Sequence, residues 1–205
     1  MANPVAAAPH VGPQAETALA PVDNSVLGVW IWLSAEAVFF ATLIGTYLLM
    51  HTHTNNGLTP KQAFDLPLTF VGTLILLSSS MTMAIGYAQL QRGRLAVFRV
   101  WLLITAVLGL GFLGFQAFEF TGFYHRGLTL QSSPFGSAFF TLTGFHGLHV
   151  AFGVFWLLSL FVYSFKREFL KEAVVKTQVL SLYWHFVDVV WVIIFSVVYL
   201  LGKVG

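Results

Sequence analysis

Five long runs of apolar residues, separated by short polar segments, dominate the sequence. Each run reaches the roughly 20 residues that a helix needs to cross the hydrocarbon core of a bilayer. The runs lack the period-2 alternation of barrel strands, and continuous helices satisfy their own backbone hydrogen bonds in lipid. The pattern therefore predicts an all-α polytopic membrane protein, a bundle of five transmembrane helices at residues 26–50, 66–90, 96–120, 136–164 and 178–202.

The composition supports a lipid environment. Of the 205 residues, 57% are hydrophobic and 9% are charged, whereas about a quarter of the residues of a soluble domain are charged. Too few charges remain to cover a surface that faces water. The chain has no cysteine, which excludes disulfides, thiolate metal sites and covalent haem attachment.

The segment before the first apolar run is rich in Ala and Pro and has no Lys or Arg. A signal peptide would begin with a basic region followed by an apolar run. We therefore expect residues 1–25 to form a disordered cytoplasmic tail, and residues 26–205 to form one transmembrane domain.

Basic residues in the connections predict the orientation. They are concentrated in two of the connections and are sparse at the opposite side of the membrane, so the positive-inside rule makes these two connections cytoplasmic. The two basic groups are Arg92, Arg94 and Arg99, and Lys166, Arg167, Lys171 and Lys176; the opposite side has Lys61, Arg126 and Lys203. The N-terminus is then cytoplasmic and the C-terminus outside. Cations spread between apolar runs orient a membrane protein and do not indicate nucleic-acid binding.

Glu36 is the first ionisable residue inside a predicted span, about ten residues from its start. An acid at this depth costs several kcal/mol and is a functional hypothesis by default. Two interpretations stay open: a proton-responsive or reactive carboxyl that faces a protein interface, or a neutral acid that hydrogen-bonds a neighbouring helix.

Histidines and acids also occur in the later spans. His146 and His149 are three residues apart, as are His185 and Asp188, so each pair shares a helix face. Imidazole and carboxylate groups could hold a transition metal, but polar residues in membrane helices more often hydrogen-bond between helices. We expect no metal and a structural polar network. We place Glu119 at the outer end of the third span, paired for structural reasons, with Arg126 or His125 as candidates.

Four segments resemble a known family. They are QAFEF (116–120), GSAFF (136–140), GFHGLHV (144–150) and YWHFVDVVW (183–191). In order and spacing they are similar to subunit III of haem–copper oxidases, the cytochrome c oxidase subunit III family, in its short five-helix bacterial form. Glu36 resembles the intramembrane glutamate of the family that reacts with carbodiimides, although the family commonly has Ser directly before it and Ala35 stands there.

The resemblance implies an accessory subunit in the bacterial cell membrane, beside subunits I and II of an oxidase that reduces oxygen and pumps protons. Such a subunit has no catalytic residue and no cofactor of its own, because the haems and copper belong to its partners. It supports proton uptake, stabilises the core and holds phospholipid, for which Lys166 and Arg167 are the candidates here. We expect cytochrome c as the electron donor. The alternatives are a quinol oxidase subunit, an accessory protein of a nitric oxide reductase from the same family, a stand-alone proton-coupled transporter using Glu36 and the histidines, and a purely structural scaffold.

Overall fold

The computed structural model describes residues 24–54, 66–166 and 169–201. All regular elements in these ranges are helices: α1 (Asn24–Met50), α3 (Leu66–Gln91), α4 (Leu95–His125), α5 (Pro134–Tyr163), α6 (Phe169–Ile194) and the π-helix η1 (Phe195–Leu201), which continues α6. Five of them are long and apolar enough to cross a membrane. The predicted fold of five transmembrane helices is confirmed.

The helix ends differ from the predicted spans by amounts that local chemistry explains. Ser133 caps α5 by accepting a hydrogen bond from the Gly136 backbone N–H at 3.0 Å, and Pro134 follows at the first helical position. α4 continues to His125, five residues beyond the predicted span. α6 begins at Phe169, nine residues early, because a helix can continue through charged residues after it leaves the hydrocarbon core.

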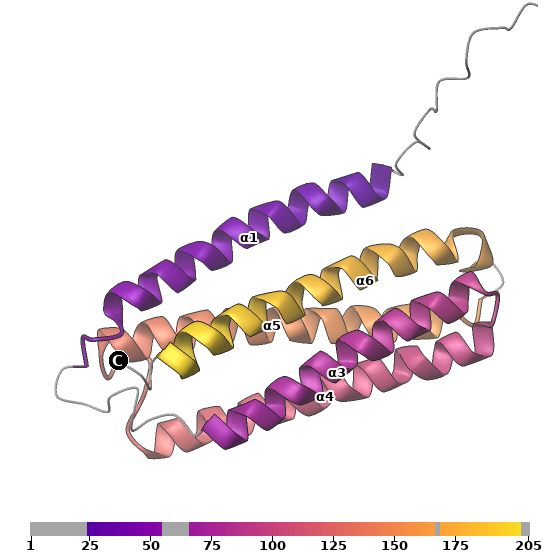
Figure 1. Cartoon of the computed structure of the whole chain (residues 1–205). Coiled ribbons are helices and arrows are strands. Elements are labelled where there is room, and N and C mark those ends of the chain that lie inside the picture. The colour runs from indigo at the N-terminus through magenta and orange to yellow at the C-terminus, as the bar shows by residue number, and fades with distance from the viewer. Residues whose placement is uncertain (1–23, 55–65, 167–168, 202–205) are drawn as a thin grey trace, which may run out of the picture.

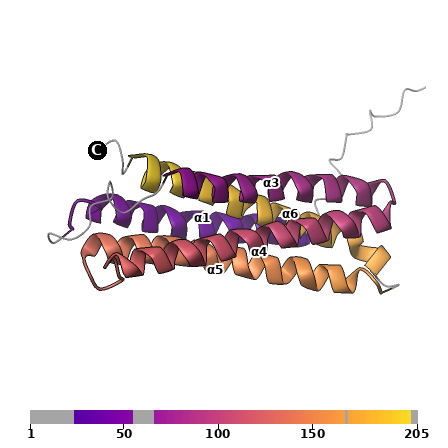
Figure 2. The same cartoon turned by 90° about the horizontal axis from the view of Figure 1, so that it is seen from below.

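The helices run up and down as a bundle. Figure 1 shows the start of α1 at the same end as the α3–α4 and α5–α6 connections. Gly93 makes the tight α3–α4 turn with a φ of 73°, a left-handed conformation that favours glycine. α3 and α4 run side by side in both views (Figures 1 and 2). Of the segment predicted as a tail, only Asn24 and Ser25 belong to the described residues, and both begin α1.

The core is centred on α6, and α1 lies at the edge. In the most apolar stretch of each helix, 56% of the α6 residues but only 11% of the α1 residues are buried. Trp184 and Trp191 of α6 are fully buried. Their indole N–H groups donate to Ser79 Oγ and Thr73 Oγ1 of α3, both at 3.0 Å. α1 is therefore attached to the bundle through few buried side chains, so each polar contact that it makes with another helix contributes to holding it in place.

Candidate functional site within the membrane

Glu36 lies near the middle of α1 and faces α5. It is twelve residues from the start of the helix, a depth of about 18 Å at 1.5 Å per residue. Its Oε1 accepts a hydrogen bond from Trp32 Nε1 at 3.1 Å, and its Oε2 is 3.3 Å from His149 Nε2. The carboxyl and imidazole side chains are 22% and 17% exposed. The sequence did not predict this pairing of Glu36 with His149.

The other ring nitrogen of His149 fixes what the pair can do. Nδ1 is 2.7 Å from the Phe145 carbonyl oxygen, and because a carbonyl only accepts, Nδ1 is the donor. In a neutral ring Nε2 then has only a lone pair. The contact with Glu36 therefore needs one proton, held either by the carboxyl or by the imidazole. Either arrangement is neutral overall, which lowers the cost of placing two ionisable groups in a bilayer.

Aromatic side chains hold this pair in place. The Trp32 ring stacks on the Tyr183 ring, with centroids 5.3 Å apart and planes at 2°. The Tyr183 hydroxyl donates to the His149 backbone carbonyl at 2.9 Å, and the Phe40 ring lies 4.9 Å from the imidazole. Trp32 thus contacts both the acid of α1 and a tyrosine of α6, so α1, α5 and α6 meet at this point.

Glu119 forms a second polar site on another face of the bundle. The prediction that it ends the third span is wrong, because α4 continues six residues further, to His125. Glu119 is buried, at 6% exposure. Its carboxyl accepts hydrogen bonds from Thr69 of α3 at 2.6 Å and from Tyr199 of η1 at 3.1 Å. Neither partner was paired with Glu119 in the sequence analysis.

Of the remaining predicted polar residues, His185 and Asp188 lie together and His146 lies at a separate contact. His185 Nδ1 is 2.6 Å from Ser80 Oγ of α3, and Asp188 is buried beside them. His146 is fully buried, stacked on Trp191 at 4.9 Å and edge-on to Phe112. The residues predicted to form one polar network therefore lie at several separate helix contacts. They are Glu119, His146, His149, His185 and Asp188. In the part of the chain that the structure describes, no three His, Asp or Glu side chains converge as metal ligands would.

Two glycines of α5, Gly147 and Gly144, differ in how closely another helix approaches them. A Cβ on Gly147 would lie 2.6 Å from Gln116 Oε1, and Gln116 donates to the Thr143 carbonyl at 2.7 Å. A Cβ on Gly144 would meet nothing within 4 Å. Gly147, unlike Gly144, therefore lies at a close approach of α5 to α4, where a small residue favours helix contact.

Arg99, expected from the sequence only to orient the chain, joins α4 to the end of α5. Its guanidinium donates to the hydroxyl and the carbonyl of Ser164, at the C-terminal end of α5, and lies 4.2 Å from the centre of the Phe165 ring. A charged side chain inside a membrane span usually pairs with another polar group. The position of Arg99 inside the predicted third span could therefore have indicated such a partner.

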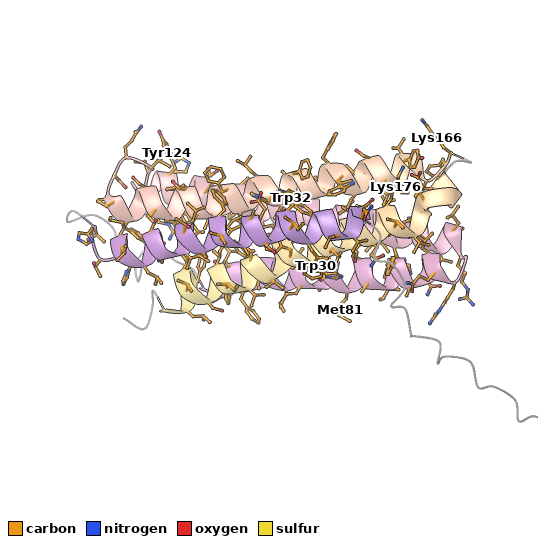
Figure 3. The ribbon with its side chains drawn as sticks, turned by 90° about the horizontal axis from the view of Figure 1, so that it is seen from above. Trp30, Trp32, Met81, Tyr124, Lys166 and Lys176 are labelled. Atoms are coloured by element: carbon orange, nitrogen blue, oxygen red, sulfur yellow. The ribbon has the colours of Figure 1, made fainter. Side chains whose placement is uncertain are left out.

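Lys166, one of the two candidate lipid residues, lies at the end of the bundle where α5 ends and α6 begins. Figure 3 shows Lys166 and Lys176 there and Tyr124 at the opposite end. A groove of about 690 Å³ runs between the start of α1 and this end of α5 and α6, lined by Ser25, Tyr163 and Lys176 among others. The Lys176 ammonium is 2.9 Å from Glu172 and lies over the Tyr163 ring. Arg167 lies outside the described residues.

Comparison with known proteins places the chain among respiratory oxidase subunits. Residues 23–203 match the family model described as cytochrome c oxidase subunit III. The chain is 44% identical over 182 residues to cytochrome c oxidase subunit 3 of Bacillus sp. (strain PS3), which covers 89% of this chain and 88% of the relative. It is 43% identical over 183 residues to cytochrome c oxidase subunit 3 of Bacillus subtilis (strain 168), at 89% and 88% coverage.

A third relative is named for a different electron donor. The quinol oxidase subunit 3 of Bacillus spizizenii (strain ATCC 23059 / NRRL B-14472 / W23) is 41% identical over 181 residues, covering 88% of this chain and 89% of the relative. The match extends over all five helices and all four motifs of the sequence analysis. The chain belongs to the cytochrome c oxidase subunit III family.

Proposed function

We propose that this chain is the accessory, non-catalytic subunit III of a proton-pumping terminal oxidase, assembled with subunits I and II. The match to subunit III over residues 23–203 supports this proposal most strongly. The five spans and the bacterial relatives make it a multi-pass protein of the bacterial plasma membrane. The end that contains the two basic connections faces the cytoplasm, following the positive-inside rule.

The haems and copper belong to the partner subunits in this proposal. The intramembrane histidines are engaged in packing and polar contacts: His149 with Glu36, His185 with Ser80 and His146 with aromatic rings. What the chain offers instead is the Glu36–His149 pair, which holds one proton within the membrane. We assign proton-related support of the catalytic core to this pair, and phospholipid binding to the Lys166 end of α5.

Cytochrome c is the proposed electron donor, and quinol is the second candidate. The relatives at 44% and 43% identity are named cytochrome c oxidase subunits, but a quinol oxidase subunit follows at 41%. This difference in identity is small, and in this proposal the donor site lies on another subunit. Activity of the purified complex with reduced cytochrome c and with a quinol separates the two.

A pull-down of the tagged chain in mild detergent tests the whole proposal. We expect haem absorption bands, together with the large catalytic subunit and the copper-bearing subunit identified by mass spectrometry. A colourless chain recovered alone, while other respiratory complexes in the extract stay intact, would contradict the proposal and favour a stand-alone transporter.

Replacement of Glu36 by Gln is expected to leave assembly intact. A Gln side chain can still accept from Trp32 Nε1 and can donate its amide to His149 Nε2. The haem content per tagged chain should therefore equal that of the wild type, whereas proton uptake by the complex should slow because the ionisable group is gone. Stopped-flow measurement of proton uptake by purified oxidase gives the second readout.

His185→Ala is the contrasting variant. It removes the partner that lies 2.6 Å from Ser80 at the α3–α6 contact, so the yield of complex should fall while the remaining complex takes up protons normally. Loss of the complex with Glu36→Gln but not with His185→Ala would reverse the two roles.

A further inference from the structure

The faces of α3 and α6 that point out of the bundle form a small groove with a polar floor. It has a volume of about 250 Å³, and its polar lining consists of Ser80, His185 and Asp188. The rim is apolar and open, since Leu77, Val189 and Ile193 are between 38% and 58% exposed. Met81, next in the chain to Ser80, is 69% exposed and points away from the bundle in Figure 3.

Asp188 is the unusual group in this groove. It is 3% exposed, and neither carboxyl oxygen makes a hydrogen bond within the described residues. The Ser80 hydroxyl is close enough to interact with the carboxyl, but it does not reach normal hydrogen-bond geometry with either oxygen. Its close contact is with His185 Nδ1, 2.6 Å away. Leaving a buried acceptor unsatisfied costs about 1–3 kcal/mol, and more when it is charged.

Other polar side chains on the outer faces of the helices are satisfied within their own helix. Their hydroxyls donate to the backbone carbonyl four residues earlier, an arrangement suited to lipid. Residues of this kind are Ser34, Thr42, Ser78, Ser159 and Ser196. Asp188 departs from this pattern, because a carboxyl oxygen needs a donor and the free N–H groups of a helix are confined to its first turn.

Lipid cannot supply that donor at this depth. Ser80 is 14 residues from the start of α3 and 11 from its end, so the groove is about 17–21 Å from either end of the helix. Acyl chains have no hydrogen-bond donors, and headgroups lie outside the hydrocarbon core. A side chain on another transmembrane helix reaches the groove without difficulty.

We propose that this groove receives a hydrogen-bond-donating side chain from a transmembrane helix of a neighbouring oxidase subunit. The outer face of α3 and α6 is then part of the interface that holds this chain in the complex, with Asp188 as the buried acceptor and the rim as its apolar surround. The inference rests on the proposed function, because it requires a neighbouring subunit.

Site-specific photo-crosslinking in the assembled complex tests the location. A photoreactive residue at Val189, on the rim, is compared with one at Val107 of α4, since both positions are 58% exposed. We expect the probe at Val189 to form an adduct with another oxidase subunit. The probe at Val107 shows how much labelling arises from exposure alone, because it is equally exposed on a different helix. Adducts of the Val189 probe with lipid alone, in a complex that still shows haem bands, would overturn the inference while leaving the proposed function intact.

Variants of Asp188 test the chemistry. Loss of one hydrogen bond to a charged group, about 1.5–3 kcal/mol, corresponds to a loss of retention of about tenfold or more at 1.4 kcal/mol per tenfold. Asp188→Leu should therefore dissociate from the haem-bearing subunits at least tenfold more readily under increasing detergent. Asp188→Asn, which keeps one acceptor, should lie between it and the wild type. The matched control Ser78→Ala removes a hydroxyl that donates to the Leu74 carbonyl of its own helix and should leave retention unchanged. Equal retention of Asp188→Leu and Ser78→Ala would overturn the inference.

Discussion

Replacement of Gly109 by alanine is expected to lower the thermal stability of the protein, although alanine normally stabilises a helix. A Cβ at this position of α4 would lie 2.7 Å from Val154 Cγ2 and 2.8 Å from the end of the Trp184 ring. The ring cannot move aside easily, because it is fully buried and its N–H is bonded to Ser79. Overpacking of this kind costs about 1–3 kcal/mol, which exceeds the roughly 1 kcal/mol that alanine gains in helix propensity.

The same helix provides the control for this prediction. Gly114, also in α4, would place a Cβ in open space, so Gly114→Ala should be neutral or slightly stabilising. Gly153→Ala on α5 should behave like Gly109→Ala, since its Cβ would lie 2.7 Å from the same Trp184 ring. The measurement is the apparent unfolding temperature of the purified complex in detergent. If Gly109→Ala and Gly114→Ala unfold at the same temperature, this result would contradict the close packing of α4, α5 and α6 around Trp184.

Glu119→Ala is expected to have the second large effect. It removes a buried acceptor from two buried donors, Thr69 of α3 and Tyr199 of η1. Each donor that loses this acceptor costs about 1–3 kcal/mol. The loss should loosen the end of the bundle where η1 packs against α3 and α4, lower the apparent unfolding temperature, and increase proteolysis near Tyr199.

An exposed glutamate provides the comparison for Glu119. The Glu172 side chain is 64% exposed and pairs with Lys176 within the same helix, an arrangement worth less than about 1 kcal/mol. Glu172→Ala should therefore change the unfolding temperature little, and Glu119→Gln, which keeps one carbonyl acceptor, should lie between the two alanine variants. Equal stability of Glu119→Ala and Glu172→Ala would show that the buried hydrogen bonds of Glu119 contribute nothing.

The helix ends show where sequence reasoning was accurate and where it failed. The start of α3 was predicted at Leu66, where the structure has it, and the start of α4 was one residue off, because polar residues and a glycine precede each of them in the sequence. The end of α4 and the start of α6 were misplaced by five and nine residues. Hydrophobicity marks the part of a helix inside lipid, whereas a helix continues for as long as its backbone bonds and capping residues allow.

The polar residues show a sharper limit. Glu36 was identified from its depth alone, since any carboxyl in a 20-residue apolar run is conspicuous. Its partner, His149, was assigned instead to a network with His146 and His185. Spacing of three residues shows that two side chains share a face of their own helix, but it does not show which other helix covers that face.

The sequence by itself determined the number of spans, their approximate ends, the membrane environment and the family, because these depend on local properties: the length of apolar runs and the presence of contiguous motifs. The tertiary structure alone decided that Glu36 meets His149, that Glu119 is buried between Thr69 and Tyr199, and that Asp188 faces a groove with no hydrogen-bond partner among the residues the structure describes. Those outcomes depend on how each helix is rotated and tilted against its neighbours. Rotation and tilt are set by the packing of many side chains at once, with Trp184 between Gly109 and Gly153 as the clearest case, and no single segment of the sequence records them.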